Sequence, residues 1–383
     1  MCVASGAAVA SAQGAARAGV LTSASKPGRN QAIDVLRGLC IVMMITAHVG
    51  TSTLINQSAH FLRFVSGAEG FVFLAGLVMG FVYRRKMQTG KVFDAYKAIW
   101  RRMLTIWLVH CGVVLMAVAG NGAFYNHAQI PRFSTHAPGE FVYLLVSLKL
   151  QPGHALNVLP LYVFLLGFAP MVFELMRRRL TWLVVAASVG LLVYTQYDPG
   201  VGSWAHGSSG DAFPPLAWQG LFVPGLCIGY HYGFIRDRVI APRRTALLWT
   251  LSLLLVATVV VVWVHTPAFA FYDRARWDAL LWNRHPLRLG RVAYFFVAIA
   301  ALYMLVQVAL ARVGMLRPSL EALALLGRNS LYSFLVHIAF SIPITGSALL
   351  TGNPIVAEAV TAGVLASVYL MARYQVGRPW VPN

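Results

Sequence analysis

Three ionisable residues lie inside the first long apolar run of the chain, DVLRGLCIVMMITAHVG at positions 34–50. Arg37 and His48 are eleven residues apart, so on a helix they would share one face and lie about 16 Å apart along the axis. Asp34 would fall within roughly 40° of His48 on that helix. Ionisable groups inside a membrane span are costly and usually face the protein interior or a water-filled path. The pattern therefore predicts a functional polar stripe along this helix.

His48 is the member of this stripe that can accept and return a proton near neutral pH. A hydroxyl group needs such a base to act as a nucleophile, and a carboxylate that orients the imidazole completes the arrangement. Glu69 opens the next apolar run, and we expect it to take this role. Asp34 lies about 21 Å from His48 along the helix, which is too far. The alternative is that His48 only hydrogen-bonds a neighbouring helix.

Asp34 and Arg37 have the three-residue spacing of a helical ion pair, which would fix the start of the helix. Arg37 could also bind an anion, and the basic segment 84–102 would extend such a site. Arginine pairs well with phosphate groups, and this segment ends with Arg101 and Arg102. The alternative is that these charges only set the orientation of the chain in a membrane.

A second polar pattern occurs in GRNSLYSFLVHIAF, at positions 327–340. Arg328 and His337 in this stretch are nine residues apart, or about 180° around a straight helix. Either the helix begins near Arg328, or only one of the two side chains faces the interior.

The composition indicates an all-α polytopic membrane protein with about ten transmembrane helices. The 383 residues are 58% hydrophobic and 11% charged, with a mean hydropathy of +0.66, whereas soluble domains have about 25% charged residues. A span needs about 20 mostly apolar residues. The ten candidate runs are residues 33–53, 69–83, 103–120, 156–176, 181–195, 216–234, 246–266, 292–311, 323–342 and 355–372.

The net charge of +19 would suggest nucleic-acid binding in a soluble protein. Here most of the 31 Lys and Arg residues fall on one side if there are ten spans and both termini are cytoplasmic. Because cytoplasmic loops are enriched in Lys and Arg, the surplus reflects membrane orientation, and no nucleic-acid partner is expected. This topology places Asp34 and Arg37 toward the cytoplasm, and His48 and Glu69 toward the outer face.

The chain divides into a transmembrane domain at residues 31–375 and two short cytoplasmic tails. Residues 1–30 are rich in Ala, Ser and Gly and are predicted to be disordered, and residues 376–383 form the second tail. The four cysteines lack metal-ligand spacing, so no metal site is expected. Small residues around the second span suit close helix packing. They are Gly67, Gly70, Gly76 and Gly80.

Five stretches spread over most of the chain carry a family resemblance. They read AIDVLRGLCIVMMITAHV (32–49), AEGFVFLAGLVMGFVY (68–83), LNVLPLYVFLLGFAPMVF (156–173), FPPLAWQGLFVPGLCIGY (213–230) and LGRNSLYSFLVHIAF (326–340). Together they resemble the OpgC family, membrane succinyltransferases of osmoregulated periplasmic glucans. That family belongs to the transmembrane acyltransferases that include acyltransferase family 3. Relatives in family 3 have an Arg and a His in the first span at the spacing of Arg37 and His48.

The resemblance implies an integral membrane O-acyltransferase of the bacterial inner membrane. It would move an acyl group such as succinyl from cytoplasmic acyl-CoA to a hydroxyl of a periplasmic glucan or another extracytoplasmic polysaccharide. Acyl-CoA would be a substrate, and no cofactor would be bound permanently. Arginines near the cytoplasmic end of the third span are a further family feature, and Arg101 and Arg102 lie there.

Each candidate residue then has an expected role. His48 would act as the general base and Glu69 would orient it. The residues expected to bind the CoA donor are Asp34, Arg37, Arg101 and Arg102. The residues expected to contact the acceptor are Trp218, Gln219 and His337, with packing as the alternative role of Trp218 and Gln219.

A transporter or polysaccharide exporter without covalent chemistry is the competing hypothesis, because intramembrane Arg and His also suit substrate coupling. A regulatory subunit of a glycan synthase is a third, and it predicts that substitutions of Arg37 and His48 are tolerated. Membrane lipid surrounds the protein in every case. The acyl group, the acceptor and the oligomeric state stay open.

Overall fold

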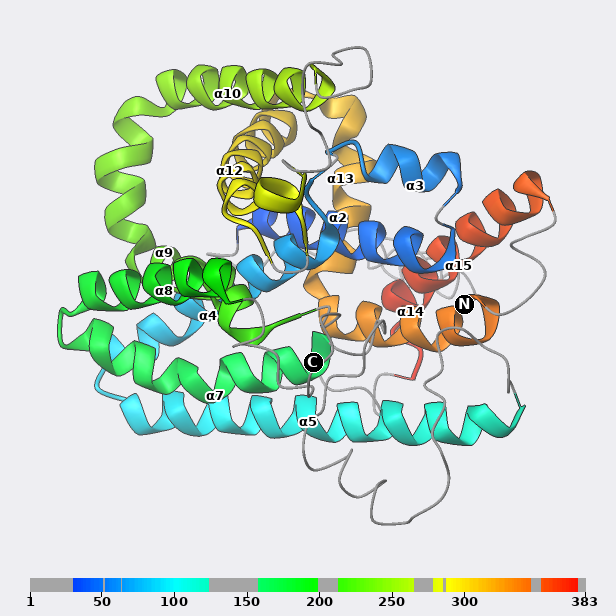
Figure 1. The fold of residues 1–383 in the computed structure, drawn as a ribbon, viewed down its shortest axis with the longest axis horizontal. Helices are drawn as coiled ribbons and strands as arrows, with labels where there is room; N and C mark the ends of the chain where they lie inside the picture. Colours follow the sequence, from blue (N-terminus) through cyan, green and yellow to red (C-terminus); the bar gives the residue numbers. More distant parts are fainter. Residues whose placement is uncertain are drawn as a thin grey trace, which may run out of the picture. The chain divides into compact units, whose positions relative to one another are not determined.

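The computed structural model describes residues 30–50, 52–62, 64–123, 158–198, 213–264, 278–284, 287–345 and 353–377. Every regular element within these ranges is a helix, as Figure 1 shows. The longer helices are α2 (Gln31–Val49), α4 (Gly67–Gln88), α5 (Val92–Ala123), α7 (Val158–Arg177), α8 (Thr181–Tyr197), α9 (Pro215–Ile235), α10 (Arg244–Val264), α12 (Leu289–Arg312), α13 (Arg317–Arg328), α14 (Ser330–Thr345) and α15 (Pro354–Tyr374). The shorter ones are α3 (Leu54–Ala59), η2 (Arg236–Ile240), η3 (Ala241–Arg243), η4 (Asp278–Trp282) and η5 (Gly314–Leu316). Most of both predicted tails lies outside the described ranges.

Each of the ten apolar runs falls largely on one of these helices, so the all-helical fold is confirmed. Five helices, α2, α4, α7, α12 and α15, are long and apolar enough to cross a membrane. Two bent helix pairs raise the number to as many as seven if each pair is one span. The pairs run from α9 into α10, with a 54° bend, and from α13 into α14, with an 88° bend. A count of ten spans and the cytoplasmic termini stay predictions.

Helices α4 and α9 pack with their backbones in direct contact. A Cβ atom added to Gly76 would lie 2.2 Å from the carbonyl oxygen of Phe222, and one added to Gly229 would lie 2.1 Å from that of Leu77. Side-chain carbons do not approach carbonyl oxygens this closely, so only glycine permits this crossing. The predicted role of the glycines in close helix packing is confirmed here.

A second close crossing joins α2 to α13. A Cβ atom on Gly38 would lie 1.9 Å from the carbonyl oxygen of Leu323, and one on Gly327 would lie 1.8 Å from that of Asp34. The backbones of the two helices therefore touch, and the glycines fix the position of α13 along α2.

The helix beyond this crossing is broken. Arg328 ends α13 and Ser330 begins α14, after the 88° bend. Arg328 and His337 therefore lie on two different helices. This answers the question raised by their nine-residue spacing, because no single straight helix has to place both on one face.

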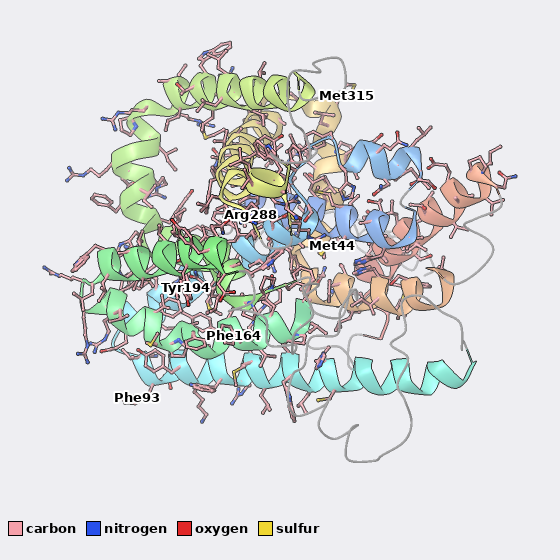
Figure 2. All side chains as sticks on the ribbon, in the orientation of Figure 1. Met44, Phe93, Phe164, Tyr194, Arg288 and Met315 are labelled. Atoms are coloured by element: carbon pink, nitrogen blue, oxygen red, sulfur yellow. The ribbon has the colours of Figure 1, made fainter. Side chains whose placement is uncertain are left out.

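Large apolar side chains are exposed on several helices. Phe93 is 87% exposed, Met315 is 86% exposed, and Tyr194 is half exposed (Figure 2). Soluble proteins rarely expose many such residues, whereas lipid tails solvate them without cost. The exposed apolar surface supports the assignment of the chain to a membrane.

Replacing Gly76 with alanine is expected to force α4 and α9 apart. We expect Gly76→Ala to destabilise the protein by about 1–3 kcal/mol, the usual range for overpacked contacts. A lower melting temperature of the purified protein in detergent would show this loss. Gly363→Ala is the matched control, because Gly363 lies on α15 with no neighbour within 4 Å of an added Cβ. An unchanged melting temperature for Gly76→Ala would contradict the backbone contact.

Candidate functional site

His48 and His337 contact each other through their imidazole nitrogens. Nδ1 of His48 lies 3.0 Å from Nε2 of His337, so one nitrogen donates and the other accepts. The ring planes are within 5° of parallel and the centroids are 5.3 Å apart, which suits a hydrogen bond made edge to edge. His337 is fully buried and His48 is half-buried. Among the described residues no hydrogen bond engages Nε2 of His48, so this nitrogen can take a proton from a bound group.

Glu69 has partners other than His48. Its Oε1 accepts a 2.6 Å hydrogen bond from Nε of Arg291 on α12, in a buried ion pair. Its Oε2 accepts the backbone N–H of Ser66 at 2.6 Å and also the Ser66 hydroxyl. Both oxygens thus serve to cap α4 and to anchor it to α12. The expected pairing is therefore corrected, because the hydrogen-bond partner of His48 is His337.

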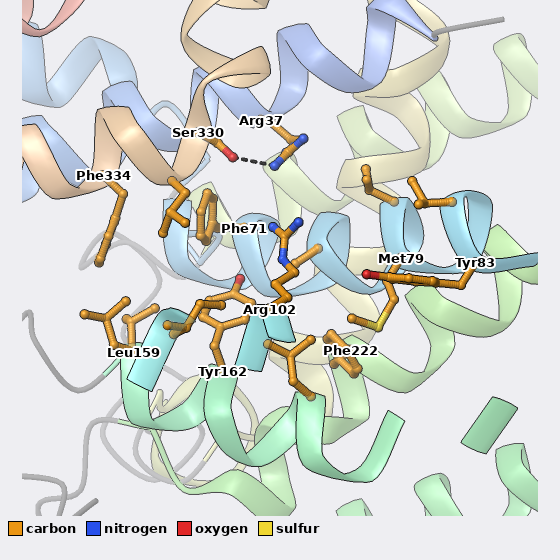
Figure 3. A pocket seen from close by; sticks show the side chains of 17 residues that line it. Arg37, Phe71, Met79, Tyr83, Arg102, Leu159, Tyr162, Phe222, Ser330 and Phe334 are labelled. Carbon is orange, nitrogen blue, oxygen red and sulfur yellow. Dashed lines mark hydrogen bonds between the residues drawn. The ribbon is translucent and has the colours of Figure 1, made fainter. Parts of the chain in front are cut away.

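A pocket of about 80 Å³ lies near the other end of α2. Figure 3 shows Arg37 from α2 and Arg102 from α5 directing their guanidinium groups into it. Nη2 of Arg37 donates a hydrogen bond to the hydroxyl of Ser330, the first residue of α14. The Tyr162 hydroxyl from α7 is buried and has no hydrogen-bond partner in the described part of the chain. Two guanidinium groups and a hydroxyl that is available to donate a hydrogen bond suit an anionic ligand.

The ring of Phe334 joins this pocket to the histidine pair. Phe334 lines the pocket together with Phe71, and their rings stack with centroids 5.9 Å apart. Phe334 also contacts the ring of His337 edge-on, with centroids 5.2 Å apart. The pocket and the histidine pair are therefore neighbours that share the Phe334 side chain.

Helices α2 and α14 position both sites. The Arg37–Ser330 and His48–His337 contacts join these helices in the same order along each, so the helices run in the same direction. The contacts are separated by about 16 Å along α2 and about 10 Å along α14. The long side chain of Arg37 accommodates part of this difference. Arg37 and His48 thus face the same neighbouring helix, as the predicted polar stripe requires.

The other residues expected to bind the CoA donor do not all lie at the pocket. Asp34 is buried one turn before Arg37 on α2, with its carbonyl oxygen against Gly327. Arg102 lines the pocket with Arg37. Both arginines are exposed, but Arg101 does not line this pocket. Of the two adjacent arginines, the structure therefore brings only Arg102 to Arg37.

Trp218 and Gln219 are packing residues in this structure. Trp218 is completely buried in the core. The Gln219 amide donates to the carbonyl oxygens of Ser188 and Leu216, at 2.9 and 3.1 Å, and accepts the Ser188 hydroxyl at 2.7 Å. These bonds join α9 to α8 and use the polar groups of Gln219. Both side chains are buried, and contact of either one with an acceptor stays a prediction.

Several residues at the site were not among the sequence candidates. Tyr162 and Ser330 line the pocket, and Arg291 neutralises Glu69. Ser330 lies 293 positions from Arg37 and Arg291 lies 222 positions from Glu69, so helical spacing gives no signal for either contact. The one usable signal is that a carboxylate in an apolar run needs a cationic partner.

The fold and the site together define an all-helical membrane protein in which an imidazole pair lies beside a cationic pocket. The family described as OpgC protein matches residues 29–379, which include every described helix. The chain belongs to this family. No curated protein matches the chain, and no solved structure matches it.

The buried ion pair gives a test of the corrected role of Glu69. We expect Glu69→Ala to destabilise the protein by about 3–5 kcal/mol, because it leaves the charge of Arg291 buried and unpaired. Thermal unfolding in detergent should show this loss, and a Glu69→Ala/Arg291→Met double variant should regain part of it. Glu321→Ala is the control, since its ion pair with Arg317 is exposed and worth less than about 1 kcal/mol. Equal melting temperatures for Glu69→Ala and Glu321→Ala would contradict a structural role for Glu69.

Proposed function

We propose that the protein is an acyl-CoA-dependent O-acyltransferase of the bacterial inner membrane. It transfers an acyl group, such as succinyl, to a hydroxyl of a periplasmic glucan or another extracytoplasmic polysaccharide. Membership of the OpgC family supports a membrane transferase role in glucan modification. The observation that carries the proposal is the half-buried His48, whose Nδ1 contacts His337 while no hydrogen bond engages its Nε2 in the described chain.

The imidazole pair suits general-base catalysis. When Nδ1 of His48 carries the proton and donates it to Nε2 of His337, the lone pair at Nε2 of His48 is available. The acceptor hydroxyl gives its proton to this nitrogen while its oxygen attacks the thioester carbonyl carbon. His337 then accepts a hydrogen bond from the charged imidazolium and holds its orientation. A carboxylate has this role in many catalytic triads.

The cationic pocket suits the CoA donor. Arg37 and Arg102 present guanidinium groups, which bind phosphate oxygens through paired hydrogen bonds. The predicted topology places this pocket toward the cytoplasm, where acyl-CoA is found, and the histidine pair toward the outer face. The acyl end of the donor would pass Phe71 and Phe334 to reach His48. The transfer would then take place at the outer end of α2.

Loss of the base is expected to slow transfer strongly. With labelled acyl-CoA and a glucan acceptor, we expect purified His48→Gln protein to transfer label about 10²–10⁴-fold more slowly than wild type. His337→Gln should give a smaller loss, because the base itself remains. His60→Gln serves as the control for loss of an imidazole, since in the described part of the chain the His60 ring bonds only the Asn56 carbonyl of the adjoining helix α3.

Two results would count against the proposal in different ways. Undiminished transfer by folded His48→Gln protein would exclude His48 as the base. No transfer by wild type with any glucan acceptor would favour an exporter without covalent chemistry.

The adjacent arginines give a matched test of the donor pocket. We expect Arg102→Ala to raise the KM for acyl-CoA by roughly 10–100-fold, the loss of one charge-assisted hydrogen bond. Arg101→Ala should change this KM by less than about 3-fold, because Arg101 does not line the pocket. Steady-state kinetics with a fixed glucan concentration would measure both. A larger effect of Arg101→Ala would place the donor elsewhere.

A further inference from the structure

The Tyr162 hydroxyl has no role in the reaction proposed so far, although it lies at the cationic pocket. Tyr162 comes from α7 and lines the pocket together with Arg37 and Arg102. Figure 3 shows its hydroxyl directed into the same space as the two guanidinium groups. The hydroxyl is buried and forms no hydrogen bond in the described part of the chain. Because buried polar groups are normally hydrogen-bonded, a ligand in the pocket can supply the missing acceptor.

The Tyr162 ring is held in one orientation. The side chain is 6% exposed, and its ring meets that of Phe71 edge-on, with centroids 5.7 Å apart and an angle of 86° between the planes. The hydroxyl is thus positioned before a ligand binds, which lowers the entropy cost of binding. A phenol beside two guanidinium groups is a hydrogen-bond donor to any group that the positive charges attract, and such a group is an anion.

The size of the pocket limits this anion to a small group. A volume of about 80 Å³ gives space for about six water-sized groups. One phosphate group fits this space, whereas a nucleoside does not. Apolar side chains line most of the remaining wall, among them Val78, Leu159 and Phe222, and they suit the carbon chain that carries the phosphate.

The distance to the histidine pair decides which anion of an acyl-CoA reaches the pocket. The Arg37–Ser330 contact lies about 10–16 Å from the His48–His337 contact along the two helices. The pantetheine arm of CoA has about thirteen bonds between its phosphorus and its sulfur, and it spans about 15 Å when extended. The distal carboxylate of a succinyl group lies only a few bonds from the thioester carbonyl carbon. With this carbon at His48, the phosphate reaches the pocket and the carboxylate does not.

We propose that the Tyr162 hydroxyl donates a hydrogen bond to the phosphate at the end of the pantetheine arm, which Arg37 and Arg102 also bind. This inference rests on the proposed acyl transfer. The guanidinium groups neutralise the phosphate charge, and the hydroxyl adds a third donor at a fixed position. The pocket thus recognises this phosphate, and the rest of the nucleotide lies outside it. The hydroxyl binds the donor and moves no proton.

Calorimetric titration of the purified protein in detergent tests this contact with three ligands. They are CoA, 4′-phosphopantetheine, which has the arm and its phosphate but no nucleoside, and pantetheine, which has no phosphate. We expect Tyr162→Phe to raise the Kd for CoA and for 4′-phosphopantetheine by about 10–100-fold, the loss of one hydrogen bond to a charged group. Pantetheine should bind weakly to both proteins, without such a difference.

Tyr162→Phe also separates binding from folding, because the variant keeps the ring and its contact with Phe71. Since the hydroxyl has no partner, its removal should leave the melting temperature of the ligand-free protein unchanged or slightly higher. Tyr197→Phe is the matched control. Tyr197 lies on α8, is 84% exposed and does not line the pocket, so its loss should change each Kd by less than about 2-fold.

An unchanged Kd for CoA in folded Tyr162→Phe protein would overturn the inference. A loss confined to CoA would also overturn it, because the hydroxyl would then contact the nucleotide elsewhere, and an equal loss for all three ligands would exclude the phosphate. A lower melting temperature without ligand would show that the hydroxyl already has a partner. CoA binding by wild type without acyl transfer would instead contradict the proposed reaction alone, and no CoA binding would contradict both.

Discussion

At Gly38 and Gly327 the backbones of α2 and α13 touch, and the positions of the functional side chains depend on this contact. The crossing leaves no freedom to slide, because each missing Cβ would overlap a carbonyl oxygen of the other helix. The chain then bends by 88°, and α14 starts beside α2. Ser330 consequently meets Arg37, and His337 meets His48 two turns further on.

The position of α14 beside α2 links two sites that differ in chemistry. The pocket around Arg37 is cationic and suits phosphates, whereas the neighbouring histidine pair suits movement of a proton. Phe334 belongs to both, since it lines the pocket and its ring contacts that of His337. A flexible acyl-CoA arm fits such an arrangement better than a bulky polysaccharide does. Donor and acceptor would therefore approach His48 from opposite sides.

The sequence predicted what short-range periodicity can encode. The helices, the shared face of Arg37 and His48 and the tight glycine packing all follow from spacing within a single helix. The hydrogen-bond partner of His48 could not be predicted from such spacing, because His337 is 289 positions away. Glu69, the expected partner, bonds to Arg291 and Ser66 instead. Trp218 and Gln219 have the polarity of a ligand site, yet both are buried, and the Gln219 amide bonds to Ser188 of α8. Such contacts are set by tertiary packing, which one sequence does not reveal.

A structure of the protein with an acyl-CoA analogue whose thioester is replaced by an uncleavable thioether would locate the donor relative to both sites. We expect the CoA phosphates to lie against Arg37 and Arg102. We also expect the carbon that replaces the thioester carbonyl to lie within about 4 Å of Nε2 of His48. An analogue bound away from the pocket between α2, α5 and α14, or with its acyl end remote from His48, would contradict the proposed binding of the donor.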